Sequence, residues 1–212
     1  MFKTFWIAST LGLVAARVIA QAAAKSDLLA RIDHILYATP DLNAGIEAIE
    51  KLTGVRATPG GQHPGLGTRN ALIALGPTSY LEIIGPDPEQ PARGGRPFGI
   101  DRLKAPRLAR WVVQAQNLEH LAAEVSRKGI QLGKVTGGKR QRPDGVLLTW
   151  RYTDPLVDLA DGLVPFFIDW GDSPHPAATA AKGLTLIALR GEHPDAARVG
   201  KILTQLGLDL PL

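Results

Sequence analysis

The 212-residue chain contains no cysteine, which excludes disulfide bonds, thiolate metal sites and cysteine nucleophiles. It also lacks a strong charge of either sign, because 24 Lys and Arg residues face 20 Asp and Glu residues and give a formal net charge of +4. That excess is too small to indicate nucleic acid or an anionic membrane as the partner. An apolar fraction of 45% and a charged fraction of 21% indicate a folded globular protein.

Several functional motifs are also missing. The sequence has no P-loop, no dinucleotide-binding fingerprint and no nucleophile elbow. A basic run at 134–142 lacks the interleaved aromatic residues of a nucleic-acid surface, so we interpret it as a solvated hairpin tip. The length has room for one compact domain or two small fused modules.

The N-terminal stretch has the features of a secretory signal peptide. Lys3 precedes an uncharged apolar run at 5–16, and a small-x-small site follows at Ala20-Gln-Ala22 or Val18-Ile-Ala20. The run is too short for a stable transmembrane span of ~20 residues. We expect export to the periplasm or the medium and exclude residues 1–25 from the fold. An uncleaved anchor and a cytoplasmic leader are the alternatives, because Arg17 interrupts the apolar stretch.

Periodicity and turn residues predict two similar modules, at 31–85 and 107–171, joined by a Pro- and Gly-rich connector at 86–106. In the first module we predict strands at 31–38, near Val55, at 70–76 and at 79–85, with a helix at 42–52 and a loop at 58–68. In the second we predict strands at 107–115, 146–152 and 163–170, a short strand within 133–145 and a helix at 117–128. A strand at 183–189 and a helix at 195–206 form a C-terminal extension, 183–212, which stops where a further strand is expected.

This order of elements predicts an α+β fold. Two tandem βαβββ modules form a curved mixed-sheet cleft, with a C-terminal βα extension. Superposing the helix starts at Asp41 and Asn117 places His34 over Arg110. Superposing Tyr80–Ile83 on Phe167–Trp170 places Glu82 over Asp169.

His34 and Glu82 each lie in an otherwise apolar strand. Burying such polar groups is costly unless they are paired, hydrogen-bonded or bound to a metal. The two residues therefore indicate a shared polar site. They are either metal ligands or a buried pair that Arg110 or the backbone satisfies.

The segments 32–38, 60–70, Tyr80–Ile83 and 164–170, together with Trp150, carry a resemblance to a known family. The chain resembles the vicinal oxygen chelate superfamily, in particular its glyoxalase-like domain proteins, a group that includes glyoxalases, bleomycin-resistance proteins and extradiol dioxygenases. The resemblance implies a divalent metal, Zn, Mn, Fe or Ni, on His34, Glu82 and Asp169. Arg110 falls on the fourth ligand position, where a guanidinium has no lone pair to donate.

Other residues complete the expected site. Arg110 either neutralises Glu82 and Asp169 or binds a substrate carboxylate or phosphate. His63 is a candidate general base, metal ligand or hydrogen-bonding partner of the substrate. Thr68, Asn70 and Trp150 complete the predicted substrate-binding set. His120, His175 and His193 are expected to be solvated.

Three functions follow from the resemblance. The first is a small-molecule enzyme in which the metal polarises two adjacent substrate oxygens and Glu82 or His63 moves a proton. Isomerase or lyase chemistry, ring-cleaving oxygenation and thiol transfer all belong to this group. The second is a metal-free module that binds an anionic or oxygen-rich ligand through Arg110. The third is a scaffold without a working site. The expected partner is a small molecule rather than nucleic acid, and a homodimer is among the assemblies that the sequence allows.

Overall fold

The computed structural model describes residues 28–90 and 94–212. The predicted signal peptide at 1–25 and part of the connector, 91–93, lie outside the described residues. Within the described ranges, no helix combines the length and apolar character that crossing a membrane requires.

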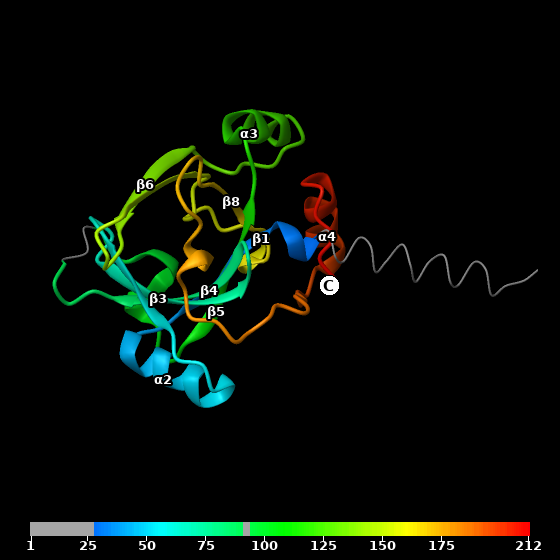
Figure 1. The fold of residues 1–212 in the computed structure, drawn as a ribbon. Coiled ribbons are helices and arrows are strands. Elements are labelled where there is room, and N and C mark those ends of the chain that lie inside the picture. The colour runs from blue at the N-terminus through cyan, green and yellow to red at the C-terminus, as the bar shows by residue number, and fades with distance from the viewer. Residues whose placement is uncertain (1–27, 91–93) are drawn as a thin grey trace, which may run out of the picture.

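The described part of the chain forms one curved sheet of eight strands with short helices around it (Figure 1). The strands are β1 (Ile32–Ala38), β2 (Thr58–His63), β3 (Thr68–Gly76), β4 (Ser79–Pro86), β5 (Arg107–Gln114), β6 (Thr136–Gln141), β7 (Leu147–Tyr152) and β8 (Phe166–Asp169). The helices are α2 (Leu42–Thr53), α3 (Leu118–Ser126) and α4 (Ala196–Gln205), with 3₁₀ turns η1 (Pro97–Arg102), η2 (Ala160–Gly162) and η3 (Pro176–Ala178).

The two halves of the sheet meet at its centre. The strand order is β2-β3-β4-β1-β5-β8-β7-β6, in which β1 and β5 pair antiparallel. Each of these central strands also pairs in parallel with the last strand of its own half, β1 with β4 and β5 with β8. The sheet curves until its edge strands β2 and β6 come into contact (Figure 1). The predicted α+β fold with two βαβββ units is thereby confirmed.

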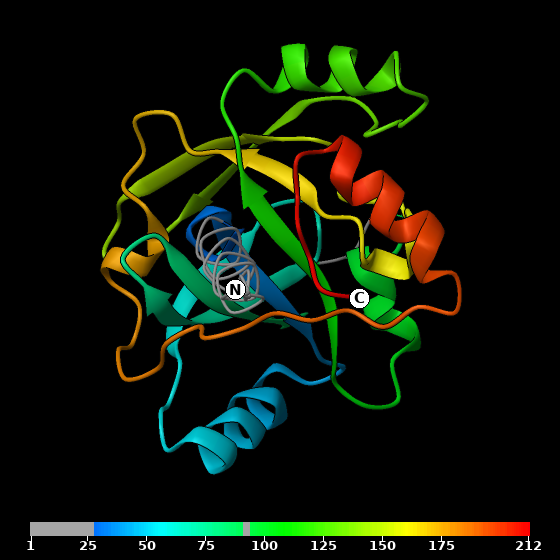
Figure 2. The same ribbon diagram turned by 90° about the vertical axis from the view of Figure 1, so that its right-hand side faces the viewer.

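Helix α2 has the boundaries that its end residues favour. The Asp41 side chain accepts hydrogen bonds from the backbone N–H groups of Asn43 and Ala44, at 2.8 and 3.1 Å. Gly54 ends the helix in the left-handed conformation, with φ of 76°. Leu42 and Ile49 pack against the strands of the first half, and the helix lies outside the curved sheet (Figure 2).

Strand β2 corrects the predicted loop at 58–68. Its two glycines suggested irregular structure, but both sit where another group approaches closely. A Cβ atom on Gly60 would lie 2.2 Å from Asn70 Oδ1. A Cβ atom on Gly61, where φ is 137°, would lie 2.5 Å from the carbonyl oxygen of Gln141 on β6. The glycines therefore let β2 pair with β3 while the opposite edge of the sheet approaches.

The C-terminal extension is only partly as predicted. Helix α4 forms, and Val199 and Leu203 on it are fully buried. The predicted strand at 183–189 does not form. Its Leu186 N donates a 3.1 Å hydrogen bond to the carbonyl of Leu75 on β3, and an isolated bridge to the same strand, between Ala181 and Ile73, lies just before the segment.

The fold predicts where a truncated side chain is most costly. Phe167 on β8 is 1% exposed and packs in the largest apolar cluster, whereas Leu147 on β7 is 56% exposed. We expect Phe167→Ala to lower the free energy of unfolding by about 3–5 kcal/mol. Leu147→Ala should change it by less than about 0.5 kcal/mol. Chemical denaturation at pH 7 measures both, and equal effects would contradict this placement of the core.

Candidate functional site

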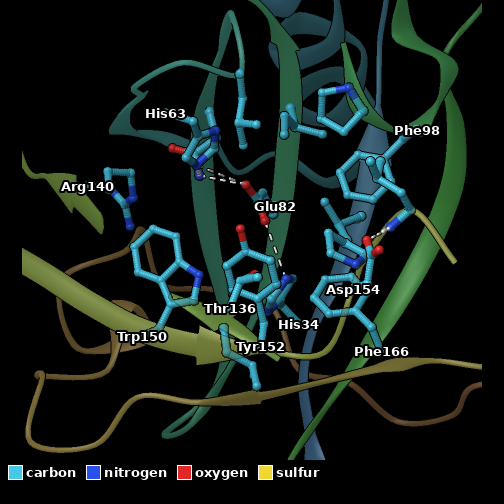
Figure 3. Close-up of a pocket in the computed structure, with 18 of the residues that line it drawn as sticks. His34, His63, Glu82, Phe98, Thr136, Arg140, Trp150, Tyr152, Asp154 and Phe166 are labelled. Carbon is cyan, nitrogen blue, oxygen red and sulfur yellow. Dashed lines mark hydrogen bonds and ion pairs between the residues drawn. The ribbon is translucent and has the colours of Figure 1, made fainter. Parts of the chain in front are cut away.

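The curved sheet encloses a cavity of about 360 Å³ whose lining differs between the two halves of the chain (Figure 3). The first half supplies His34, His63, Asn70 and Glu82, and the second half supplies Lys134, Thr136, Arg140 and Asp154. The wall is mostly aromatic, with Tyr80, Phe98, Trp150, Tyr152, Phe166 and Trp170. A cavity of this size, apolar with a few convergent polar groups, is typical of small-molecule sites.

His34 and Glu82 meet at the base of the cavity. Their strands β1 and β4 are neighbours, and the register pairs His34 with Tyr80 and Leu36 with Glu82. His34 Nε2 lies 3.4 Å from Glu82 Oε2, and the two residues are 4% and 6% exposed. The ring of Tyr80 stacks on the imidazole at a centroid distance of 4.7 Å. The structure thus brings together the two residues on which the sequence argument rested.

Asp33 orients the His34 ring. The β1–β5 register shifts between Ile32 and His34, so Asp33 is the extra residue of a β-bulge. Its Oδ1 lies 2.6 Å from His34 Nδ1, and its Oδ2 accepts hydrogen bonds from Trp170 Nε1 at 2.9 Å and His175 Nε2 at 3.1 Å. Burial raises the pKa of Asp33, but the bonds from His175 and His34 outweigh it and bring the pKa to about 2.

An ionised Asp33 fixes the proton on His34. A carboxylate can only accept, so His34 Nδ1 must carry the proton that forms their bond. In the neutral ring, Nε2 then has a lone pair, which faces Glu82 Oε2 at 3.4 Å. Two lone-pair atoms that face each other in a buried site require a proton or a cation between them.

His63 adds a third acceptor. Its Nδ1 lies 3.0 Å from Thr68 Oγ1, and its Nε2 lies 3.7 Å from Glu82 Oε1. The Asn70 amide donates to Glu82 Oε1 at 2.7 Å and lies 3.4 Å from His63 Nε2. Burial lowers the pKa of His63, although the charge of Glu82 partly opposes it, so the ring is neutral at pH 7.

We tested the fit of a divalent metal on these donors. Two ligands about 2.1 Å from one ion at a tetrahedral angle are roughly 3.4 Å apart, which is the separation of His34 Nε2 and Glu82 Oε2. Within residues 28–90 and 94–212, however, no group of three or more His or acidic side chains is arranged to hold an ion. The pair therefore fits two ligand positions, and His63 Nε2 lies 3.7 Å from the other carboxylate oxygen of Glu82.

The structure does not bring Asp169 to this pair. Phe166 and Ile168 on β8 line the cavity, whereas Asp169, the last residue of the strand, does not. Its Oδ1 instead accepts a 2.9 Å hydrogen bond from the backbone of Gly171. Side chains alternate along a strand, so a ligand contributed by β8 would require a shift of one residue.

Arg110 also lies away from the pair. It is opposite Leu36 in the register, but its Nη2 lies 3.2 Å from Asp158 Oδ1. Its side chain lines a separate polar hollow beside η1. Of the other predicted residues, Asn70 and Trp150 line the cavity, and Thr68 is buried behind His63.

Three residues in or beside the site, Asp33, His175 and Arg140, were not predicted from the sequence. Asp33 directly precedes His34, but a regular strand would point it to the opposite face. His175 was expected to be solvated, yet it bonds Asp33, and its Nδ1 accepts from the backbone of Ala177 at 3.2 Å. Arg140 belonged to the basic run assigned to a solvated hairpin, yet it is 3% exposed and lines the cavity.

Comparison with family models gives a match to the glyoxalase-like domain over residues 32–207. The chain belongs to the glyoxalase-like domain family. This places it in the vicinal oxygen chelate superfamily, as the resemblance implied. A search of curated proteins gives no significant match.

Several solved structures are similar to this glyoxalase-like domain protein at low identity. A hypothetical protein from Staphylococcus aureus is 18% identical with a TM-score of 0.49, over 68% of this chain and 60% of its own. Methylmalonyl-CoA epimerase from Mycobacterium tuberculosis is 17% identical with a TM-score of 0.42, over 66% and 87%. A methylmalonyl-CoA epimerase in complex with methylmalonyl-CoA and NH4+ is 19% identical with a TM-score of 0.45, over 69% and 98%.

The lowered pKa of Asp33 predicts a pH dependence of stability. Relative to its ordinary value of 3.8, a folded-state pKa of about 2 stabilises the native state above pH 4 by about 2 kcal/mol. That contribution is lost as the pH falls through about 2. We expect Asp33→Asn to be less stable at pH 7 and to lose less further stability between pH 4 and pH 2.

Urea unfolding across this pH range checks the prediction. Asp172→Asn, at an exposed position, controls for the loss of one negative charge. Parallel pH curves for the wild type and Asp33→Asn would contradict an ionised, hydrogen-bonded Asp33.

Proposed function

We propose that this protein is a small-molecule enzyme that moves a proton next to a carbonyl group, in lyase or isomerase chemistry assisted by a divalent metal. The observation that supports this proposal is the buried pair of His34 and Glu82, whose lone-pair atoms face each other at 3.4 Å inside an aromatic cavity. The substrate would carry two adjacent oxygens.

His34 and Glu82 would hold the ion. Bound there, a divalent metal would act as a Lewis acid that polarises substrate oxygens and stabilises an enolate-like charge. Asp33 supports this role because it keeps the His34 proton on Nδ1 and leaves Nε2 available. Asn70 holds the other carboxylate oxygen of Glu82 and so fixes its orientation.

His63 is the proposed proton acceptor. Burial lowers its pKa, so the imidazole is neutral at pH 7 and can take a proton. If Nδ1 donates to Thr68 Oγ1, then the single lone pair of Nε2 accepts from Asn70 and is the position that would take the proton. In the absence of a metal, Glu82 is the alternative base. A substrate packed against the aromatic walls would displace water from the reacting groups.

A metal-free binding module that uses Arg110 has weaker support. The guanidinium of Arg110 already has an acidic partner in Asp158 and does not line the cavity of His34 and Glu82. An anionic ligand bound there would lie in the hollow beside η1, where it would not contact the buried pair.

Metal titration tests the proposal. Protein purified without a histidine tag should bind one equivalent of Zn²⁺ or Mn²⁺ by isothermal titration calorimetry. Glu82→Gln and His34→Ala should weaken that binding at least tenfold, since each removes one of two ligands. Asp169→Asn, a matched acidic control outside the cavity, should bind as the wild type does. Equal affinity of the wild type and Glu82→Gln would contradict the proposed ligand pair.

We also propose that the protein is exported. Leu28 is 3% exposed and packs in the largest apolar cluster, so cleavage before it would leave the core intact. Mass spectrometry of protein from the native host should give an N-terminus at Gln21 or Ala23, after Ala20 or Ala22. An intact Met1 in the cytoplasmic fraction would contradict export.

A further inference from the structure

Arg140 is a buried cation at the seam of the curved sheet. It lies on the edge strand β6 and is 3% exposed. One of its Nη atoms donates to the carbonyl of Gly60 on β2, the opposite edge of the sheet. Its side chain also lines the cavity of His34 and Glu82, on the side where His63 and Trp150 lie (Figure 3).

The acids in the described part of the chain do not form an ion pair with this guanidinium. Within residues 28–90 and 94–212, the arginines that form ion pairs within 4.0 Å are Arg56, Arg96, Arg110, Arg142, Arg151 and Arg198. Arg140 is not among them, and the nearby Glu82 is already bonded to Asn70. Burial lowers the pKa of Arg140, but a guanidinium stays charged at neutral pH.

A buried guanidinium lowers the stability of the folded protein unless an anion binds to it. A buried charge costs several kcal/mol without a partner, and the carbonyl of Gly60 uses one of five guanidinium donors. The remaining donors form the planar fork that binds a carboxylate through two parallel hydrogen bonds. The hollow beside η1 differs, because Arg110 and Arg96 there are paired with Asp158 and Asp101.

We propose that Arg140 binds the carboxylate of the substrate, which makes the substrate a small, largely aromatic or apolar carboxylic acid. Its apolar part would contact the aromatic wall, and its reacting oxygens would reach His34 and Glu82. This inference rests on the proposed function for the reaction, but the carboxylate site itself requires neither the metal nor proton transfer.

Calorimetry with two probes of the same shape tests the inference. Phenylacetate carries the carboxylate, and phenylacetamide replaces it with a neutral amide. We expect the wild-type protein to bind phenylacetate at least tenfold more tightly than phenylacetamide. Arg140→Gln should reduce this preference to less than threefold, and Arg140→Lys should leave an intermediate value. No preference in the wild type would overturn the inference.

Arg142→Gln is the matched control. It removes one positive charge just beyond the same strand, from a side chain that is paired with Asp144 and does not line the cavity. It should keep the wild-type preference, and a loss as large as that of Arg140→Gln would overturn the inference. Arg140→Gln removes the partner of the Gly60 carbonyl. If that variant fails to fold, the preferences for phenylacetate measured with the wild type and with Arg140→Lys test the inference. An Arg140→Lys preference equal to that of the wild type would then count against the guanidinium fork.

Glu82→Gln separates this inference from the proposed function. That variant lacks the carboxylate proposed to bind the metal, so a preference for phenylacetate that persists in it, and is lost in Arg140→Gln, belongs to Arg140 and not to an ion or to Lys134. A preference that disappears in Glu82→Gln but survives in Arg140→Gln would overturn the inference and leave the metal proposal standing. A wild-type protein that binds no metal but still prefers phenylacetate would overturn the metal proposal and leave the inference about Arg140 standing.

Discussion

The hydrogen bond from His34 Nδ1 to the ionised carboxylate of Asp33 fixes which nitrogen of the His34 ring faces Glu82. Asp33 is fully buried, and it accepts from Trp170 and His175 as well. The bonds from His175 and His34 outweigh the cost of burying its charge. Because the His34 proton is held on this side of the ring, the opposite nitrogen faces the carboxylate of Glu82.

The fold supplies this arrangement from separate parts of the chain. A bulge in β1 brings the Asp33 side chain to His34, and the parallel pairing of β1 with β4 brings Glu82. Trp170 and His175 come from the segment after β8, more than a hundred residues away. Curvature of the sheet then closes the cavity, where Gly60 and Gly61 leave room for Asn70 and the edge strand β6.

The sequence indicates the central pair but not its surroundings. His34 and Glu82 stand out because polar residues in apolar strands need a partner, and that argument requires only local patterns. Asp33 has no such signal, since a bulge cannot be recognised from alternation alone. Arg140 resembles a solvated residue of a basic hairpin until the sheet closes, because its burial depends on a contact with Gly60 eighty residues away.

The role of the glycines of β2 also depends on contacts that the local sequence does not reveal. Read locally, 58–68 is a loop, and only the approach of Asn70 and Gln141 explains why a strand needs glycine there. Asp169 shows how repeat alignment can place a residue on the correct strand but on the wrong face. Duplication preserves the order of elements, which is why the architecture could be predicted. The side chains that line the cavity differ between the two halves.

The most direct test of the arrangement around Asp33, His34 and Glu82 is to determine which nitrogen of the His34 ring carries the proton. Long-range ¹⁵N–¹H NMR of the imidazole at neutral pH should show a proton on Nδ1 bonded to Asp33, and Zn²⁺ should shift the Nε2 resonance. Asp33→Asn should lose the low-field Nδ1 proton. A ring protonated only on Nε2, or an Nε2 signal that does not respond to the metal, would contradict the account.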